Sequence, residues 1–121
     1  MKIILFSKSD YNFSAQLAKI CDLDSDQLFF LNEFKFLSKN SYENDSIIII
    51  DLDDSYESLD SIVEDIRFFS SAPLYGLMEK MDIKIQKNAT RVGFDMVMTK
   101  SMFIYNIKTI RIQIKNAFRK S

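Results

Sequence analysis

The chain contains no histidine, a single cysteine (Cys21), a single proline (Pro73) and two glycines, Gly76 and Gly93. One cysteine cannot form a disulfide within the chain. The absence of histidine excludes the usual zinc ligand sets, and it also excludes histidine-based acid–base pairs and histidine-activated nucleophiles. Glycine and proline, which are common in linkers, are scarce. The sequence also shows no internal repeat and no low-complexity tract. The commonest catalytic and metal-binding machinery is therefore missing.

Long hydrophobic runs are also missing. The apolar start of the chain, residues 1–6, is too short for a signal peptide, and the polar residues 7–10 end it. No apolar stretch approaches the roughly 20 residues that a membrane-spanning helix needs. We therefore expect a soluble, cytoplasmic protein without a membrane partner.

The composition is that of a globular protein, since 47% of the 121 residues are hydrophobic and 27% are charged. A chain of this length fits one domain and can bury a core, for which eleven phenylalanines and six methionines supply bulky side chains. We expect a single domain over residues 1–121. Whether the natural protein continues past Ser121 into an effector domain is left open by the sequence.

The charges are segregated along the chain. Residues 1–79 carry 6 basic and 15 acidic residues, a net charge of −9, whereas residues 80–121 carry 10 basic and 2 acidic residues, a net charge of +8. One interpretation is a dipolar molecule with an acidic and a basic surface. The other is that the two halves neutralise each other in the fold, and the sequence does not decide between them.

Short apolar runs alternate with segments of helical periodicity. Residues 47–50 are four consecutive isoleucines, which predicts a strand buried on both faces. A short helix is expected at Phe34 and Leu37. The other predicted strands are residues 2–6, 28–31, 74–78 and 96–98. Strand–helix repeats of this kind predict an α/β fold with a doubly wound, five-stranded parallel sheet.

Two of the helical segments carry further signals. Asp82 and Gly93 are expected to begin and end one helix. Its apolar stripe comprises Ile85, Ala89 and Val92. The last segment has two interpretations, because residues 110, 112 and 114 alternate as in a strand, whereas residues 104, 107, 114 and 118 repeat as in a helix. Length and the preceding strand–helix order favour a helix.

Sites in doubly wound folds form at the carboxyl ends of the strands, and the residues there resemble the receiver domain of bacterial response regulators. The run Gly93-Phe94-Asp95-Met96-Val97-Met98-Thr99-Lys100 is similar to the family's G-A-D-D-Y-L-T-K run, and residues 47–51 look like its third strand. The resemblance spans nearly the whole chain and implies a flavodoxin-like receiver fold. It also implies that Asp51 stands at the phosphoacceptor position and Lys100 at the position of the phosphate-pairing lysine.

Five positions depart from the family pattern. Ser7 and Lys8 replace the two acidic residues that hold Mg²⁺ after the first strand. Met78 replaces the hydroxyl residue that moves onto the phosphate, Val97 replaces the switch aromatic, and Ser101 replaces the proline after the lysine. The resemblance therefore implies an atypical receiver with a degenerate phosphorylation site, a pseudo-receiver.

Phosphoryl transfer to a carboxylate needs a metal to neutralise charge, and Mg²⁺ prefers oxygen ligands that include carboxylates. Because Ser7 and Lys8 cannot replace two carboxylates, we expect no metal, no cofactor and no catalytic residue. Our hypothesis is that the Lys8 ammonium lies near Asp51 and repels Mg²⁺. Such an ion pair would be favourable, because opposite unit charges about 4 Å apart attract each other by roughly 4 kcal/mol near a protein surface.

Three further carboxylates complicate this hypothesis: Asp10, Asp53 and Asp54. They could rebuild an acidic cluster around Asp51 that binds Mg²⁺. The alternative, which we favour, is that Asp53 and Asp54 lie on a solvated loop and cap the next helix. Lys100 also has a simpler interpretation, as a surface lysine that pairs with Asp51 without any phosphate.

The last predicted helix carries a basic face. Ile112 falls off the main apolar stripe and is expected to be exposed there. The basic residues of this face, spaced three, four and four apart, are Lys108, Arg111, Lys115 and Arg119. The face is either a solvated helix exterior or, as in the receiver family, a protein-docking surface. For docking we favour a closed homodimer, in which Asp95 pairs with one of these cations across a two-fold axis.

We interpret the chain as a non-enzymatic pseudo-receiver in signal transduction that acts through contacts with a protein partner, independently of phosphorylation. The alternatives are a working receiver phosphorylated on Asp51 and the regulatory domain of a DNA-binding transcription regulator. We do not expect this domain alone to bind nucleic acid, because it has no basic motif interleaved with aromatic residues and its isoelectric point is about 5.4.

Overall fold

The computed structural model describes residues 1–38, 45–54 and 58–119, which form a five-stranded, all-parallel sheet. The strands lie in the order β2-β1-β3-β4-β5, which is the order of flavodoxin-like doubly wound folds. Their bounds are β1 Lys2–Phe6, β2 Gln27–Phe30, β3 Ser46–Asp51, β4 Leu74–Met78 and β5 Met96–Thr99. The predicted α/β fold with a doubly wound parallel sheet is confirmed.

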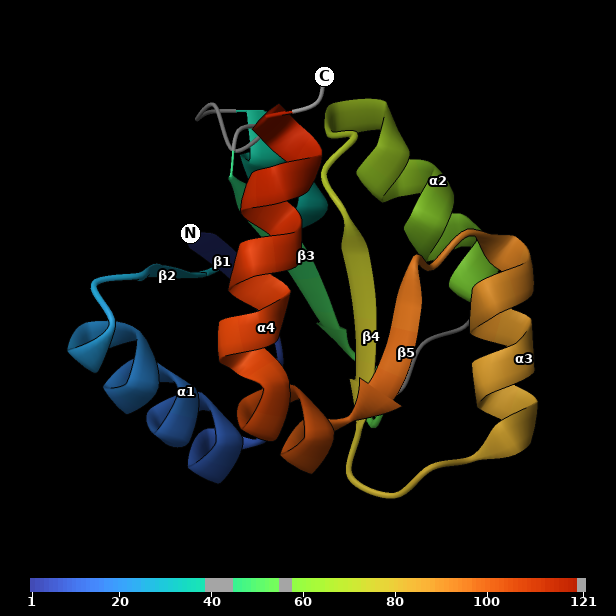
Figure 1. Cartoon of the computed structure of the whole chain (residues 1–121). Coiled ribbons are helices and arrows are strands. Elements are labelled where there is room, and N and C mark those ends of the chain that lie inside the picture. The colour runs from blue at the N-terminus through green and yellow to red at the C-terminus, as the bar shows by residue number, and fades with distance from the viewer. Residues whose placement is uncertain (39–44, 55–57, 120–121) are drawn as a thin grey trace.

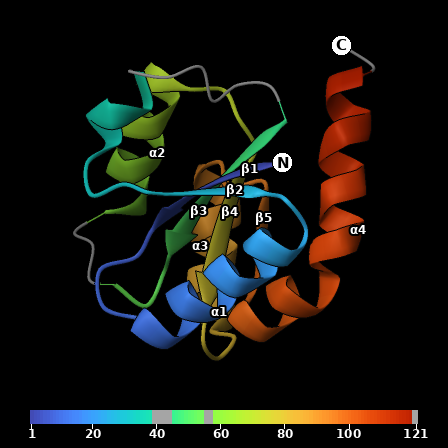
Figure 2. The ribbon, with the colours of Figure 1, turned by 90° about the vertical axis from the view of Figure 1, so that its left-hand side faces the viewer.

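Helices cover both faces of this sheet (Figures 1 and 2). One face is covered by α1 (Tyr11–Leu23) and α4 (Lys100–Arg119), and the other by α2 (Leu59–Phe69) and α3 (Ile83–Val92). The short helix expected after β2 is a 3-10 helix, η1 (Phe34–Ser38), which packs beside α2. Because both faces are covered, the strands can be apolar along their whole length.

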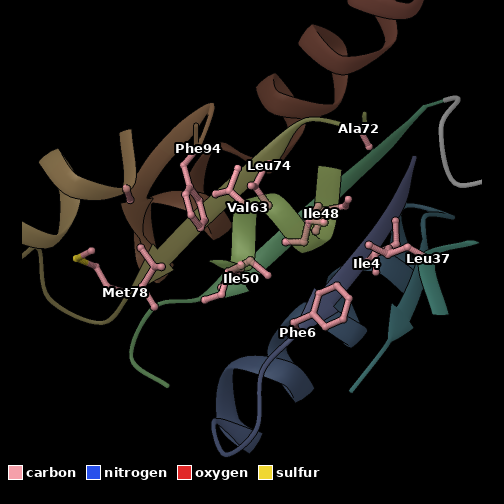
Figure 3. Packing of buried hydrophobic residues seen from close by; sticks show 14 residues of the cluster. Ile4, Phe6, Leu37, Ile48, Ile50, Val63, Ala72, Leu74, Met78 and Phe94 are labelled. Carbon is pink, nitrogen blue, oxygen red and sulfur yellow. The ribbon is translucent and has the colours of Figure 1, made fainter. Parts of the chain in front are cut away.

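The isoleucines of β3 are fully buried and divide between the two faces of the sheet. Ile48 and Ile50 belong to the cluster under α2 and α3, while Ile47 and Ile49 belong to the cluster under α1 and α4. Figure 3 shows the first cluster, with Phe6 and other side chains around Ile48 and Ile50. Full burial of each isoleucine stabilises the fold by about 1.5–3 kcal/mol. Their burial and the middle place of β3 in the strand order confirm β3 as a central buried strand.

The ends of α3 follow the predicted local chemistry, but its apolar stripe is narrower than expected. The Asp82 carboxylate caps the helix, and Gly93 ends it with a φ of +123°, a conformation that favours glycine. Ala89 is buried and Val92 half-buried, whereas Ile85 is exposed. The reason is that, among the described elements, α3 packs chiefly against α2 and the edge strand β5, so it covers the margin of the sheet.

The last segment is helical over Lys100–Arg119, as the favoured interpretation predicted. The side chains that α4 buries against the sheet are Phe103, Ile107, Ile110 and Ile114. Ile112 is 60% exposed, as expected, because it lies about half a turn from both Ile110 and Ile114. No helix in the described residues is long and apolar enough to cross a membrane.

Candidate functional site

One lysine and three aspartates meet at the carboxyl ends of β1, β3 and β5. Asp10 follows β1, Asp51 ends β3, Asp53 lies just after it, and Lys100 begins α4 directly after β5. Because the strands are parallel, these ends share one edge of the sheet, where doubly wound folds form their sites. These four residues are called the lysine-centred cluster below.

The Lys100 ammonium lies between the three carboxylates. Its Nζ is 2.8 Å from Oδ2 of Asp10, 3.0 Å from Oδ2 of Asp51 and 2.9 Å from Oδ2 of Asp53. The side chains of Lys100 and Asp51 are only 5% and 2% exposed. Burial by itself lowers the pKa of Lys100, but the hydrogen bonds to the three carboxylates outweigh burial and hold this pKa above its ordinary value. Lys100 is therefore a firmly protonated internal cation.

Both oxygens of the Asp51 carboxylate have hydrogen-bond donors. The Ser7 hydroxyl donates to Oδ2 over 2.7 Å, and the backbone N–H of Asp53 donates to Oδ1 over 3.0 Å. With Lys100 also on Oδ2, the buried carboxylate has the partners that a buried charge requires. Ser7 thus occupies a position where the receiver family has an acid, and it acts there as a neutral donor.

Asp10 and Asp53 connect the cluster to neighbouring segments. The Asp10 carboxylate caps α1 through the Phe13 backbone N–H, and its second oxygen accepts from Lys100. The Lys100 hydrogen bond, followed by that of the Phe13 N–H, lowers the pKa of Asp10. Oδ2 of Asp53 also accepts from the Glu79 backbone N–H, over 2.8 Å. The cluster therefore joins the loops after β1, β3 and β4 to the start of α4.

The backbone of Lys8 contacts the loop after β3, close to the lysine-centred cluster. Its N–H donates to Oδ2 of Asp54 over 2.9 Å, and burial raises the pKa of Asp54. The ammonium group that the structure places 3.0 Å from Asp51 is that of Lys100, whereas our hypothesis assigned this place to Lys8. The structure thus brings Lys100 beside Asp51 from the start of α4, and the hypothesis for the Lys8 ammonium stays a prediction.

Asp53 and Asp54 do not cap α2, so the interpretation that we favoured for them is wrong. The cap of α2 is Ser58, whose hydroxyl accepts from the backbone N–H of Ser61. The two aspartate carboxylates instead accept hydrogen bonds from across the sheet edge. A tertiary contact with Lys100 has prevailed over the local capping preference.

The resemblance assigns Met78 to the position of the receiver family's phosphate-binding hydroxyl. It is buried at the end of β4, within the apolar cluster of Figure 3. Its Sδ accepts a hydrogen bond of 3.1 Å from the Asp82 backbone N–H. Met78 therefore packs under the start of α3, while Val97 is half-buried and Ser101 is exposed.

The residues around Asp51 do not fit the Mg²⁺ ion that the receiver resemblance implies. Mg²⁺ requires an octahedral set of oxygen ligands, but Ser7 supplies only a hydroxyl and the Lys100 ammonium stands among the carboxylate oxygens. In the part of the chain that the structure describes, no three His, Cys, Asp or Glu side chains are arranged to hold a metal. The acidic cluster that Asp10 and Asp53 were considered to build does form, with a lysine as its counter-ion.

The outer face of α4 presents part of the predicted basic surface. Lys108 and Lys115 are exposed beside Ile112. Tyr105, one helical turn from Lys108, is 88% exposed. The side chain of Arg119 lies outside the described part of the structure. The face is therefore a mixed surface of exposed apolar side chains and lysines.

Arg111 does not lie exposed on this face, which corrects our prediction. It is half-buried and donates hydrogen bonds to Asp24 over 3.1 Å and to both oxygens of Asp26. Although burial raises the pKa of Asp26, the hydrogen bonds from Arg111 hold it below the ordinary value. Here the acidic and basic halves of the chain neutralise each other. The acidic run of residues 22–26 was the available signal in the sequence.

Asp95 is also engaged within the molecule. Its Oδ2 accepts hydrogen bonds from the Leu74 backbone N–H over 2.8 Å and from the Arg67 guanidinium over 3.1 Å. The closed dimer that we favoured relied on an ion pair between Asp95 and the last helix of a second copy. Arg67 of the same chain would therefore compete for this carboxylate, and the two-fold dimer stays a prediction.

Comparisons with known proteins show the fold. No protein-family model matches this chain, and no curated protein matches it. A response regulator receiver protein from Pseudoalteromonas atlantica superposes with a TM-score of 0.61 at 18% identity, covering 91% of this chain and 96% of that one. A CpaE2 pilus assembly protein from Sinorhizobium meliloti superposes with a TM-score of 0.62 at 10% identity, covering 89% and 98%. The chain therefore has a receiver-like, flavodoxin-like fold.

Proposed function

We propose that this chain is a pseudo-receiver, a signalling module that acts through protein contacts without phosphorylation and without catalysis. The observation that carries the proposal is the Lys100 ammonium, held within 3.0 Å of carboxylate oxygens of Asp10, Asp51 and Asp53. Phosphoryl transfer to Asp51 requires added positive charge beside the incoming group. Receivers also have a lysine at the position of Lys100, but with Ser7 and Lys8 in place of the two metal-holding acids, the ammonium of Lys100 is the positive charge that lies beside Asp51.

A divalent cation would have to displace Lys100 to reach these oxygens. Displacement breaks hydrogen bonds to charged groups, which contribute about 1.5–3 kcal/mol each, and it leaves an ammonium in a largely buried position. Ser7 and Lys8 offer no carboxylate in compensation. The balance therefore favours the lysine over Mg²⁺, which gives up its own water ligands reluctantly.

Asp51, the carboxylate that a working receiver would phosphorylate, is also poorly placed to attack a phosphodonor. Asp51 is 2% exposed, and each of its oxygens accepts at least one hydrogen bond. Attack on a phosphodonor would require one oxygen to lose its partners and reach solvent. Even if Asp51 were modified, Met78 and Val97 lack the hydroxyl and the aromatic ring that carry the signal in the receiver family.

Phosphorylation can be tested directly with acetyl phosphate and Mg²⁺, followed by intact-protein mass spectrometry. We expect no phosphorylated chain over a range of pH and Mg²⁺ concentrations, and Asp51→Asn provides the background control. The paired variant Ser7→Asp/Lys8→Asp returns the two acids and tests whether their loss is the barrier. A Mg²⁺-dependent phosphoryl adduct on the unaltered chain that Asp51→Asn abolishes would establish the working receiver instead.

The protein contacts that the proposal requires are assigned to the outer face of α4. Its exposed residues include Tyr105, Lys108, Ile112 and Lys115. Exposed apolar side chains flanked by cations are typical of protein-docking surfaces. Removal of the Ile112 side chain should then weaken partner binding more than removal of the Lys115 side chain, because exposed ion pairs contribute only about 0–1 kcal/mol.

A further inference from the structure

The outer face of α2 is acidic and carries an exposed phenylalanine. Asp60, Glu64 and Asp65 are all exposed, and Phe68 is 82% exposed. Glu64 and Phe68 are four residues apart, so they lie one turn from each other at the middle of the solvent-facing side. Lone exposed apolar residues are common, but a large aromatic ring within an acidic helix face is a suitable centre for a contact.

The outer face of α4 has the complementary character. The helix contains no aspartate or glutamate between Lys100 and Arg119. Lys108 and Lys115 are exposed beside Tyr105 and Ile112. Tyr105 and Ile112 are seven residues apart, which places them two turns apart on the same side. Thus α4 offers two exposed apolar side chains beside cations, whereas α2 offers one exposed apolar side chain beside anions.

The two faces lie on opposite sides of the molecule. α2 packs on the sheet face that contains Ile48 and Ile50, and α4 on the face that contains Ile47 and Ile49. Figure 2 shows α2 and α4 at opposite sides of the sheet. The two outer faces therefore cannot meet within one chain. Pairing of either face with itself would bring like charges together, which a two-fold contact cannot avoid.

From this complementarity, we infer that the acidic α2 face of one copy docks on the basic α4 face of a second copy. The inference rests on the proposed function, because it names the partner of the α4 surface. The contact joins two different surfaces, so each bound copy leaves one free face of each kind. Association of this type adds further copies head to tail unless rotation closes a ring.

The chemistry sets the expected behaviour of this contact. Phe68 meets the Tyr105 and Ile112 side chains, and this apolar contact supplies most of the affinity. The surrounding ion pairs are exposed and screened by salt. These ion pairs favour docking of an α2 face on an α4 face, and the like charges of two α4 faces disfavour their pairing with each other. We therefore expect weak association that grows with protein concentration and decreases at high ionic strength.

The test is sedimentation velocity at low ionic strength, over protein concentrations up to the millimolar range. The wild-type chain should form a concentration-dependent series of oligomers. Phe68→Ser and Ile112→Ser should each be monomeric, because each removes one of the two faces. Both side chains are exposed, so folding should be unaffected. Leu23→Ser, which alters an exposed apolar residue of α1, is the matched control and should behave like the wild type.

Mixing the two variants distinguishes this contact from a closed dimer. Phe68→Ser keeps an intact α4 face and Ile112→Ser keeps an intact α2 face, so the mixture should form a dimer that grows no further. A wild-type dimer that resists Phe68→Ser would show that α4 pairs with itself and would overturn the inference. A monomeric wild type, or association only with an added acidic protein, would overturn it too. None of these results depends on whether Asp51 accepts phosphate, so the proposed function is tested separately.

Discussion

The Lys100 ammonium and the Asp51 carboxylate form a buried ion pair, with Nζ 3.0 Å from Oδ2. The pair lies at the carboxyl ends of the strands, where doubly wound folds usually bind a ligand. Asp10 and Asp53 share the same ammonium, and Ser7 shares the same carboxylate oxygen. These side chains form a salt-bridge network at that place, and the predictions below follow from that arrangement.

Replacement of Lys100 with methionine should strongly destabilise the fold. It leaves three carboxylates close together without a counter-ion, and removal of one partner of a buried pair costs about 3–5 kcal/mol. We expect the lower end of this range, since Asp10 and Asp53 are partly exposed. Urea unfolding measures the change. Lys84→Met, at an exposed position of α3, is the control and should change stability by less than about 0.5 kcal/mol.

Replacement of Asp10 with asparagine should reveal a pH-dependent contribution to stability. The hydrogen bond from Lys100 lowers the pKa of Asp10 in the folded chain below the ordinary 3.8. Its contribution is therefore fully present above pH 3.8 and is lost as the pH falls through the lower, folded-state pKa. The difference in unfolding free energy between the wild type and Asp10→Asn should shrink over this acidic window. A difference that stays constant into strong acid would contradict the ion pair.

Arg111 and Lys108 should respond very differently to the same substitution. Arg111→Met leaves the buried Asp26 carboxylate without its guanidinium partner and should cost close to the lower end of about 3–5 kcal/mol, because the N-terminal ammonium of Met1 still lies 3.1 Å from Oδ1 of Asp26. Lys108→Met, at an exposed position of the same helix, should cost less than about 0.5 kcal/mol. Thermal and urea unfolding of the two variants provide the comparison. Similar effects would mean that Arg111 is a surface cation, as the sequence alone suggested.

Mg²⁺ at millimolar concentrations should leave the cluster unchanged. Lys100 competes for the same oxygens, and Ser7 and Lys8 provide no acidic ligand. Amide shifts of Asp51 and Asp53 during an NMR titration report on this directly. Lys100→Met serves as the comparison, because it removes the competing ammonium and leaves the missing acidic ligands unchanged. Saturable binding to the wild type would show that Asp10 and Asp53 have taken over the missing ligand role.

Asp51→Asn should leave self-association nearly unchanged. Asp51 lies at the carboxyl edge of the sheet, whereas the proposed contacts use the outer faces of α2 and α4, and distant sites usually contribute independently. We expect a change in the dissociation constant of no more than about twofold, because non-additivity at such distances is about 0.3–0.5 kcal/mol. Sedimentation of this variant beside the wild type measures it. A tenfold change would reveal coupling between the cluster and the surface.

The sequence by itself determined the sheet and much of the core. Four consecutive isoleucines and the regular strand–helix order predict buried parallel strands, because only a strand covered on both faces tolerates such a run. Asp82 and Gly93 mark the start and the end of α3 through contacts within one helical turn. Both ends of this helix could therefore be predicted from the local sequence. The position of Asp51 at the end of β3 followed from the same pattern.

Only the tertiary structure decided which charges meet. Asp51 and Lys100 are 49 residues apart along the chain, and parallel pairing of β3, β4 and β5 brings their ends to one edge. The sequence pattern therefore assigned a capping role to Asp53, whose carboxylate instead accepts a hydrogen bond from Lys100. Arg111 shares the sequence spacing of the exposed lysines, but its side of α4 faces Asp26 and not solvent. Helical periodicity places a residue on one side of a helix, while the packing of the neighbouring elements determines what that side meets.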